Sequence, residues 1–102
     1  MEIRIACIGK LKSKAILELE SAYLTRLRKR CQLSIQEIDD RPHAKLSASE
    51  RRIKDSHRVL ESIGKHEALV VLDEGGRKYS SYDFASFLNG FITTSSIKPV
   101  FA

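Results

Sequence analysis

The chain has 102 residues, of which 42% are hydrophobic and 30% are charged, and its formal net charge is +5. This length suits one domain over residues 1–102, and the composition is that of a folded globular protein rather than a disordered one. Apolar runs of about five residues are far shorter than the ~20 that cross a bilayer. The charged start Met1–Arg4 lacks the apolar core of a secretory signal. We therefore expect a cytoplasmic protein with no membrane partner, and the basic charge favours a polyanionic one.

The cysteines and histidines show no metal-ligand spacing. Cys7 and Cys31 are too far apart for a metal-binding cysteine motif, and we expect both to be reduced thiols. Cys7 lies in an apolar segment, where a small buried hydrophobic side chain is the expected role. His43, His57 and His66 are expected on the surface or on helix faces. We predict no metal site.

The first half of the chain predicts strand, helix and strand. Glu2–Ile8 alternates and then becomes apolar before Gly9, which is typical of a strand. Ser13 is suited to cap a helix that runs to about Arg30. The apolar stripe of this helix consists of Ile16, Leu19, Tyr23 and Leu27. Leu33–Ile38 alternates strictly between apolar and polar residues. One face of this second strand is more polar, which predicts a position at the edge of a sheet.

The next segments predict a loop, a helix and a strand. Residues 39–46 include a proline and form the loop. Ser47 and Glu50 match a capping box for a helix that ends near Gly64. Its expected apolar face consists of Ile53, Leu60 and Ile63. Ala68–Leu72 predicts a short strand buried on both faces.

The last segments predict a loop, a helix and a final strand. Residues 73–79 form the loop, and the helix covers residues 81–93. Its three phenylalanines, Phe84, Phe87 and Phe91, favour a role in the core over a platform for a cofactor. Residues 93–96 should break this helix, and residues 97–102 begin another strand. The alternation of strands and helices predicts an α/β fold, a parallel sheet with helices on both faces and right-handed crossovers.

Known chemical motifs are largely absent. No dinucleotide-binding or P-loop glycine pattern follows a strand, and no G-x-S-x-G elbow appears. Gly75–Gly76 follows a strand and can be a simple turn or an anion-binding nest. The acidic pairs Asp39–Asp40 and Asp73–Glu74 are sequence neighbours, whose side chains usually point apart. These pairs therefore predict no shared catalytic cleft.

Basic residues gather in three places: residues 10–14, 26–30 and 41–54. The cluster at residues 26–30 complements the dipole at a helix end. Each cluster alone can be a solvated surface. The other two lie in loops that flank the first strand and the second helix, and they could share one rim that contacts RNA phosphates. The candidate RNA contacts are Lys10, Lys12, Lys14, Arg41, Lys45 and Arg51.

Four motifs occur in one order and spacing along the chain. They are Ile8-Gly9-Lys10-Leu11-Lys12, Glu20-x-x-Tyr23-x-x-Arg26-Leu27, an acid-rich loop before Ser49-Glu50, and Leu72-Asp73-x-x-Gly76-x-x-x-Ser80-Ser81. Together they resemble the N-terminal part of the bacterial SPOUT methyltransferases that N3-methylate a pseudouridine in 23S ribosomal RNA. The resemblance covers the whole chain.

The resemblance implies a homodimeric enzyme that uses S-adenosyl-L-methionine and acts on 23S rRNA in the ribosome. Leu72 matches a position that contacts the cofactor, and Asp73, Glu74, Gly75 and Gly76 lie beside it. The family's sheet places the last strand of this chain between the first and the third. Family members continue into a trefoil knot, so we expect the knotted part to be missing here and the catalytic residues to lie beyond residue 102.

Three functional hypotheses follow. The first is the family enzyme, represented by its N-terminal part. We expect this part to bind the cofactor poorly and not to turn over, and the sequence does not decide whether it dimerises. The second is a non-catalytic ribosome- or RNA-binding domain that uses the basic rim alone, which salt-dependent RNA affinity without cofactor binding would favour. The third is an α/β interaction domain without RNA affinity. A missing neighbour strand would also expose the edge of the Ala68–Leu72 strand.

Overall fold

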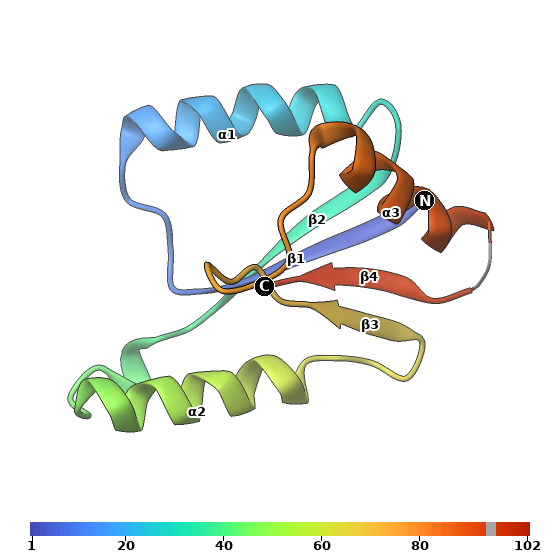
Figure 1. Cartoon of the computed structure of the whole chain (residues 1–102). Coiled ribbons are helices and arrows are strands. Elements are labelled where there is room, and N and C mark those ends of the chain that lie inside the picture. The colour runs from blue at the N-terminus through green and yellow to red at the C-terminus, as the bar shows by residue number, and fades with distance from the viewer. Residues whose placement is uncertain (94–95) are drawn as a thin grey trace.

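The computed structural model describes residues 1–93 and 96–102 as a parallel sheet with helices on both faces (Figure 1). The elements are β1 (Glu2–Ile8), α1 (Lys14–Leu27), β2 (Gln32–Ile38), the 3-10 helix η1 (Arg41–His43), α2 (Ala48–Glu61), β3 (Glu67–Val70), α3 (Ser81–Thr93) and β4 (Lys98–Phe101). Helices α1 and α3 lie on one side of the sheet and α2 lies on the other (Figure 1). The predicted α/β fold is confirmed. Of the predicted helix break, residues 94 and 95 lie outside the described residues.

The strand order is β2-β1-β4-β3, and all neighbours are parallel. β1 and β2 pair along seven residues each, from Glu2↔Gln32 to Ile8↔Ile38. β4 pairs with β1 on one side and with β3 on the other. The prediction that the last strand lies between the first and the third is therefore confirmed. The edge position of β2 is confirmed, and β3 forms the opposite edge of the described sheet.

The core is centred on β4. Val100 and Pro99 are fully buried, and Phe101 is nearly so. The remaining buried apolar side chains are Ala6, Leu33 and Ile38, which come from β1 and β2. An interior parallel strand is covered on both faces, which explains why its residues are apolar.

Aromatic rings join α3 to this core. The Phe84 and Phe101 ring centroids are 5.9 Å apart, and those of Phe87 and Phe91 are 5.4 Å apart. Tyr79 contacts both Phe84 and Phe87. The three phenylalanines of α3 therefore pack with one another and with β4, as predicted.

The prediction that Ala68–Leu72 is buried on both faces is wrong. β3 covers Glu67–Val70, and its residues are half-buried. Val71 and Leu72 are 63% and 68% exposed. The reason is that β3 ends at Val70, so Val71 and Leu72 lie beyond the strand, where no described helix covers them. The expected unpaired edge is confirmed, because β3 is bonded only to β4 among the described residues.

Helix α1 starts as predicted and ends earlier. The Ser13 hydroxyl accepts a hydrogen bond from the Ile16 N–H at 3.4 Å, the expected cap. The helix ends at Leu27 rather than near Arg30, because the chain must turn to bring the Gln32 N–H within 2.9 Å of the Met1 carbonyl. The apolar stripe of α1 stays largely exposed.

Helix α2 turns a different face inward from the predicted one. Ser47 caps it as expected, but Ile53 and Leu60 are 61% and 58% exposed. The half-buried side chains of the helix interior are Asp55, Arg58 and Val59. Polar contacts to the loop before the helix cause this rotation, as described below.

Cys7 is half-exposed rather than fully buried, so that prediction is wrong. Its thiol lies 3.6 Å from the Gln36 carbonyl oxygen on β2, the edge strand, which covers it only partly. Partial burial, with Glu37 and Glu20 nearby, raises the pKa of the Cys7 thiol above its ordinary value. The thiol is therefore protonated at neutral pH, which does not suit a nucleophile.

Candidate functional site at the carboxyl edge of the sheet

The carboxyl ends of all four parallel strands meet at one edge of the sheet, where α/β proteins commonly bind ligands. Two regions of this edge carry the residues singled out in the sequence. One is a pocket after β1 and β2. The other is the turn after β3.

The pocket has a volume of about 370 Å³ and lies where β1 and β2 end. It is lined by Ile8, Gly9, Lys10, Lys12, Glu37, Ile38, Asp39, Asp40 and Arg41. A hydrogen bond of 2.7 Å from the Gly9 N–H to the Ile38 carbonyl joins the carboxyl ends of β1 and β2 next to the pocket. The pocket is therefore built by two segments that are far apart in the sequence.

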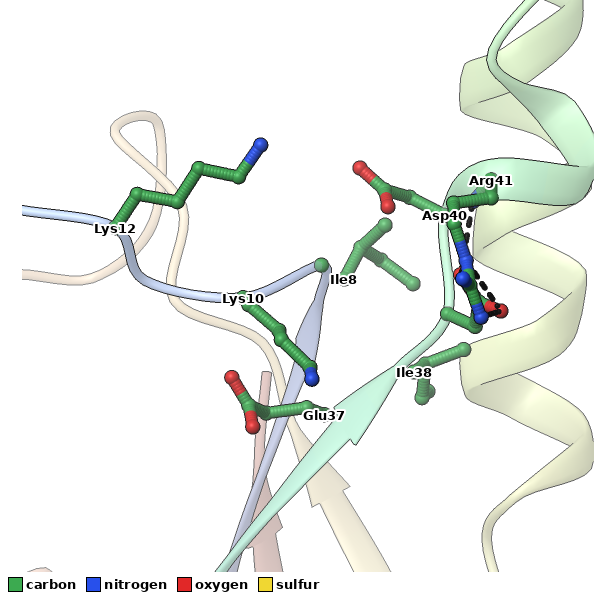
Figure 2. A pocket seen from close by; sticks show the side chains of 9 residues that line it. Ile8, Lys10, Lys12, Glu37, Ile38, Asp40 and Arg41 are labelled. Atoms are coloured by element: carbon green, nitrogen blue, oxygen red, sulfur yellow. Dashed lines mark hydrogen bonds and ion pairs between the residues drawn. The ribbon is translucent and has the colours of Figure 1, made fainter.

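Charges of both signs face one another across this pocket. Figure 2 shows Lys10 and Lys12 on the segment after β1, and Glu37 and Asp40 on β2 and the segment after it. The side chain of Lys10 extends toward Glu37, and the carboxylate of Asp40 lies on the side of the pocket toward Lys12 (Figure 2). Such a site suits a ligand that carries both an anionic group and hydrogen-bond donors.

Asp39 and Arg41 neutralise each other. The Arg41 guanidinium donates to both Asp39 carboxylate oxygens at distances of 2.8 to 3.1 Å, and the Arg41 N–H donates to Oδ1 at 3.0 Å. These hydrogen bonds lower the pKa of Asp39 to about 2. Asp39 therefore holds the turn in place rather than offering a free carboxylate.

The turn that carries these acids is anchored to α2. The His43 Nδ1 lies 3.2 Å from the Asp55 carboxylate, and both side chains are largely buried. The Arg58 guanidinium donates to the Asp39 carbonyl oxygen. These contacts explain why α2 turns Asp55 and Arg58 inward and leaves Ile53 and Leu60 exposed. His43 is therefore half-buried and paired, whereas His57 and His66 are exposed, as expected.

The structure brings together only part of the predicted RNA-contacting set. Lys10, Lys12 and Arg41 line one pocket, so the two basic loops do share a rim. The three other candidates are exposed outside the pocket lining: Lys14 begins α1, Lys45 follows η1 and Arg51 lies in the first turns of α2. Because the Arg41 guanidinium is held by Asp39, the two lysines are the cations best placed to contact a ligand.

The turn after β3 is open to solvent. Leu72 donates its N–H to the Ala102 carbonyl at 2.7 Å, which extends the ladder between β3 and β4 by one bond. Asp73, Glu74, Gly75 and Gly76 are all exposed. No described helix covers this turn, so an exposed apolar surface, Val71 and Leu72, remains at the edge of the sheet.

The glycine pair in this turn adopts the simple-turn geometry. The Gly75 N–H donates to the Asp73 carboxylate at 3.0 Å, and the Gly76 N–H donates to the Asp73 carbonyl at 3.0 Å. The one positive-φ glycine of the described residues is Gly9, at 82°. An anion-binding nest needs a left-handed residue and free N–H groups, and this turn provides neither.

Sequence reasoning missed the contact between Gly9 and Asp40. A Cβ built on Gly9 would lie 3.0 Å from the Asp40 Oδ2, so the carboxylate rests against the glycine backbone. The sequence does show a glycine directly after the first strand and an acidic pair directly after the second. Their meeting depends on strand pairing, which the local pattern does not reveal.

Groups of three or more metal-binding side chains are absent from the described residues. The helices of this part of the chain are all too short or too polar to span a membrane.

Comparison with known proteins agrees with the motif-based resemblance. A family model described as "Predicted SPOUT methyltransferase" matches residues 1–102. A protein of Porphyromonas gingivalis named "Ribosomal RNA large subunit methyltransferase H" is 30% identical over 102 residues, covering 99% of this chain and 65% of the relative. Proteins of the same name from Acetivibrio thermocellus and Desulfitobacterium hafniense are 36% and 33% identical, over 89% and 87% of this chain.

The chain spans 58% to 65% of the length of these relatives. The match of the family model covers every residue, and the parallel α/β sheet agrees with it. The chain belongs to the SPOUT methyltransferase family.

Proposed function

We propose that residues 1–102 supply an RNA-facing edge and one wall of a methyl-donor site in an S-adenosyl-L-methionine-dependent methyltransferase of large-subunit rRNA. The observation that carries this proposal is the family match over the whole chain, supported by the relatives' names. The resemblance further suggests N3 of a pseudouridine in 23S rRNA as the acceptor, the ribosome as the setting, and a cytoplasmic homodimer as the active form.

The exposed turn after β3 fits one side of a cofactor. Val71 and Leu72 offer apolar surface at the edge of the sheet, suited to an adenine ring or a thioether-like chain. The turn's glycine N–H groups are bonded to Asp73, so they offer no donors to a ligand. S-adenosyl-L-methionine would supply an activated methyl group there, and this chain's contribution is an apolar contact through Leu72.

One wall is not enough for tight binding or turnover. Each tenfold loss of affinity corresponds to ~1.4 kcal/mol, and a ligand contacted on one side forgoes most of its burial. Methyl transfer also requires donor and acceptor in line, an arrangement worth roughly 7–11 kcal/mol when complete. We therefore expect weak cofactor binding and no methyl transfer by the 102-residue chain.

The RNA-facing edge is proposed from charge and position. Lys10 and Lys12 line the pocket without an ion pair among the described residues. Lys14 is exposed close to them in sequence, and Lys45 and Arg51 are exposed on the segments that follow Arg41. Free lysines on one rim attract phosphates and release counterions, which makes binding salt-dependent. They would position the RNA and carry no sequence information by themselves.

A non-catalytic RNA-binding domain is the alternative. The observation that favours it is the contrast between a pocket formed wholly within this chain and a cofactor turn exposed on its outer side. In that case the basic rim would bind RNA and Leu72 would have no role in catalysis.

A chimera tests the proposal. Residues 1–102 are joined to the part of the Acetivibrio thermocellus relative that follows the matched region, and transfer of a radiolabelled methyl group to large-subunit rRNA is measured. We expect labelling by the chimera, none by the 102-residue chain, and loss of labelling in the chimera with Leu72→Asp. The matched control, Leu60→Asp on the exposed face of α2, should keep the activity.

An inactive chimera that folds and still binds rRNA would favour the alternative. Equal labelling by the Leu72→Asp chimera would contradict the role of Leu72 while leaving the family function in place. Circular dichroism of each protein establishes that it is folded.

A further inference from the structure

The Asp40 carboxylate is an unusual feature of the pocket after β1 and β2. It is exposed and has no hydrogen bond or ion pair within the described residues, whereas its neighbour Asp39 is fully occupied by Arg41. Asp40 is the N-cap residue of η1, and its side chain makes no capping hydrogen bond. Its two oxygens are therefore available to a ligand.

Gly9 accounts for the position of this carboxylate. Its φ of 82° lies in the left-handed region, and an added Cβ would meet the Asp40 Oδ2 at 3.0 Å. The Gly9 N–H to Ile38 bond fixes the backbone on which the carboxylate rests, and the His43–Asp55 contact anchors the other side of the turn. The backbone that carries Asp40 is thus anchored on both sides, which lowers the entropic cost of placing its carboxylate against a ligand.

The surroundings of Asp40 define the kind of ligand. Ile8 and Ile38 contribute apolar lining, which suits a flat ring, and Lys10 and Lys12 stand across the pocket as phosphate contacts. A volume of about 370 Å³ is near the lower end for ligand sites and suits a group the size of one nucleotide. A carboxylate accepts two parallel hydrogen bonds.

Guanine is the base that matches a carboxylate best. Its N1–H and N2–H donors lie side by side on the Watson–Crick edge. Adenine and cytosine present one amino donor beside a ring-nitrogen acceptor, and uracil presents one N–H between two carbonyl oxygens, which a carboxylate repels. Sequence-specific proteins read unpaired RNA bases on this edge.

We propose that the pocket between β1 and β2 binds an unpaired guanine nucleotide of the RNA, with Asp40 reading the base and Lys10 and Lys12 contacting the phosphates. This inference rests on the RNA-binding part of the proposed function and deepens it. It needs no methyl donor, because the pocket is formed by the two strand ends alone.

The test uses the 102-residue chain and fluorescein-labelled single-stranded RNA heptamers, six uridines around one central G, A, C or U. Affinities are measured by fluorescence anisotropy at about 50 mM salt, because low salt strengthens contacts to phosphates. We expect the G heptamer to bind at least about tenfold more tightly than the others, the size of a good bidentate base contact. Asp40→Asn should reduce this preference to within about twofold, because its amide N–H faces the guanine donors.

Matched variants separate the roles. Asp83→Asn, which makes the same change of charge on α3, should keep the guanine preference. Lys10→Gln with Lys12→Gln should weaken all four heptamers alike and reduce the salt slope by about 0.7 per phosphate contact. Gly9→Ala should lower the preference without removing a charge, since its Cβ displaces Asp40. Circular dichroism checks that each variant is folded.

Equal affinity for the four heptamers would overturn the inference and leave the proposed rRNA methyltransferase untouched. A guanine preference that survives both Asp40→Asn and Gly9→Ala would also overturn it, since the base would then be read elsewhere. Failure to bind any heptamer would contradict the inference together with the RNA-binding edge. If the chimera is inactive but the guanine preference depends on Asp40, the methyltransferase proposal is contradicted and the guanine site stands.

Discussion

The two halves of the sheet's carboxyl edge are built very differently. After β1 and β2, seven-residue strands lead into a turn held by Asp39–Arg41 and His43–Asp55, and the two segments enclose a pocket. After β3, a four-residue strand leads into a turn closed only by its own Asp73, and Val71 and Leu72 face solvent.

This difference shows which functions the chain can carry alone. The pocket side places charged groups at defined positions using contacts within residues 1–102, so a binding role there needs nothing further. The turn side offers apolar surface without enclosure, so a role there depends on additional groups that cover it. The RNA-binding and cofactor-binding parts of the proposed function are therefore separable by experiment.

The largest expected effect is at the strand both halves share. Phe101→Ala on β4 removes a ring that is 6% exposed and contacts Phe84. We expect a loss of about 3–5 kcal/mol in the free energy of unfolding, measured by urea denaturation. Tyr82→Ala on α3, where the ring is 82% exposed, is the control and should change it by less than about 0.5 kcal/mol. Similar losses for both variants would contradict a core centred on β4.

The next effect tests the bridge between the halves. The Arg4 guanidinium on β1 donates to both Glu67 oxygens on β3 at 2.8 and 3.2 Å, spanning β4, and the Gly64 N–H donates to the same carboxylate. Glu67→Gln should cost about 1.5–3 kcal/mol at neutral pH, since these are charge-assisted hydrogen bonds in a partly buried site. Glu2→Gln, which breaks the half-exposed Glu2–Lys98 pair, should cost much less.

The same bridge predicts a pH dependence. Hydrogen bonds from Arg4, and then from Gly64, lower the pKa of Glu67 in the folded protein. Its stabilisation is therefore present above the unfolded glutamate pKa of about 4.3 and is lost as the pH falls through the lower folded value. The stability gap between the wild type and Glu67→Gln, followed by urea denaturation, should narrow below about pH 4. A gap that stays constant to low pH would contradict the ion pair.

A smaller effect concerns the base of the pocket. Gly9→Ala should destabilise the protein by about 1–2 kcal/mol, because φ there is 82° and alanine disfavours the left-handed region. Gly90→Ala, in the interior of α3, has nothing within 4 Å of the added Cβ and should stabilise by about 0.5–1 kcal/mol. Thermal unfolding measures both. The same sign for the two variants would refute this account of Gly9.

The smallest expected effect is a change in the pKa of a single side chain, Asp39. Asp39 should titrate at a pKa of about 2, because Arg41 donates hydrogen bonds to its carboxylate. Arg41→Gln should return this pKa toward the ordinary aspartate value, followed by NMR of the carboxyl carbon. An unchanged pKa in the variant would show that Arg41 does not hold the turn.

Local patterns predicted most of the framework and few of the contacts between its parts. The caps at Ser13 and Ser47 and the alternation in β1 and β2 depend on near neighbours, so the sequence revealed them. The inward face of α2 was mispredicted from the spacing of its apolar residues. The orientation of the helix is set instead by Asp55 and Arg58, which bond to His43 in η1 and to the Asp39 carbonyl before it.

The candidate site was predictable only in part for the same reason. Lys10, Lys12 and Arg41 could be assigned to one rim because parallel strands end at one edge. The unpaired edge of β3 was expected, but the exposure of Leu72 was missed, because an apolar run indicates a strand without showing where it ends or what covers its faces. The Gly9–Asp40 contact needed the pairing register of β1 and β2.

An NMR titration of the ¹⁵N-labelled chain with S-adenosyl-L-methionine distinguishes the two halves of the edge. We expect amide shifts confined to residues 71–76, with half-saturation at about millimolar concentration, because the contact is on one side only. Shifts centred on Lys10 and Asp40, or saturable binding at about micromolar concentration, would contradict the separation of a complete RNA pocket from a one-sided cofactor wall.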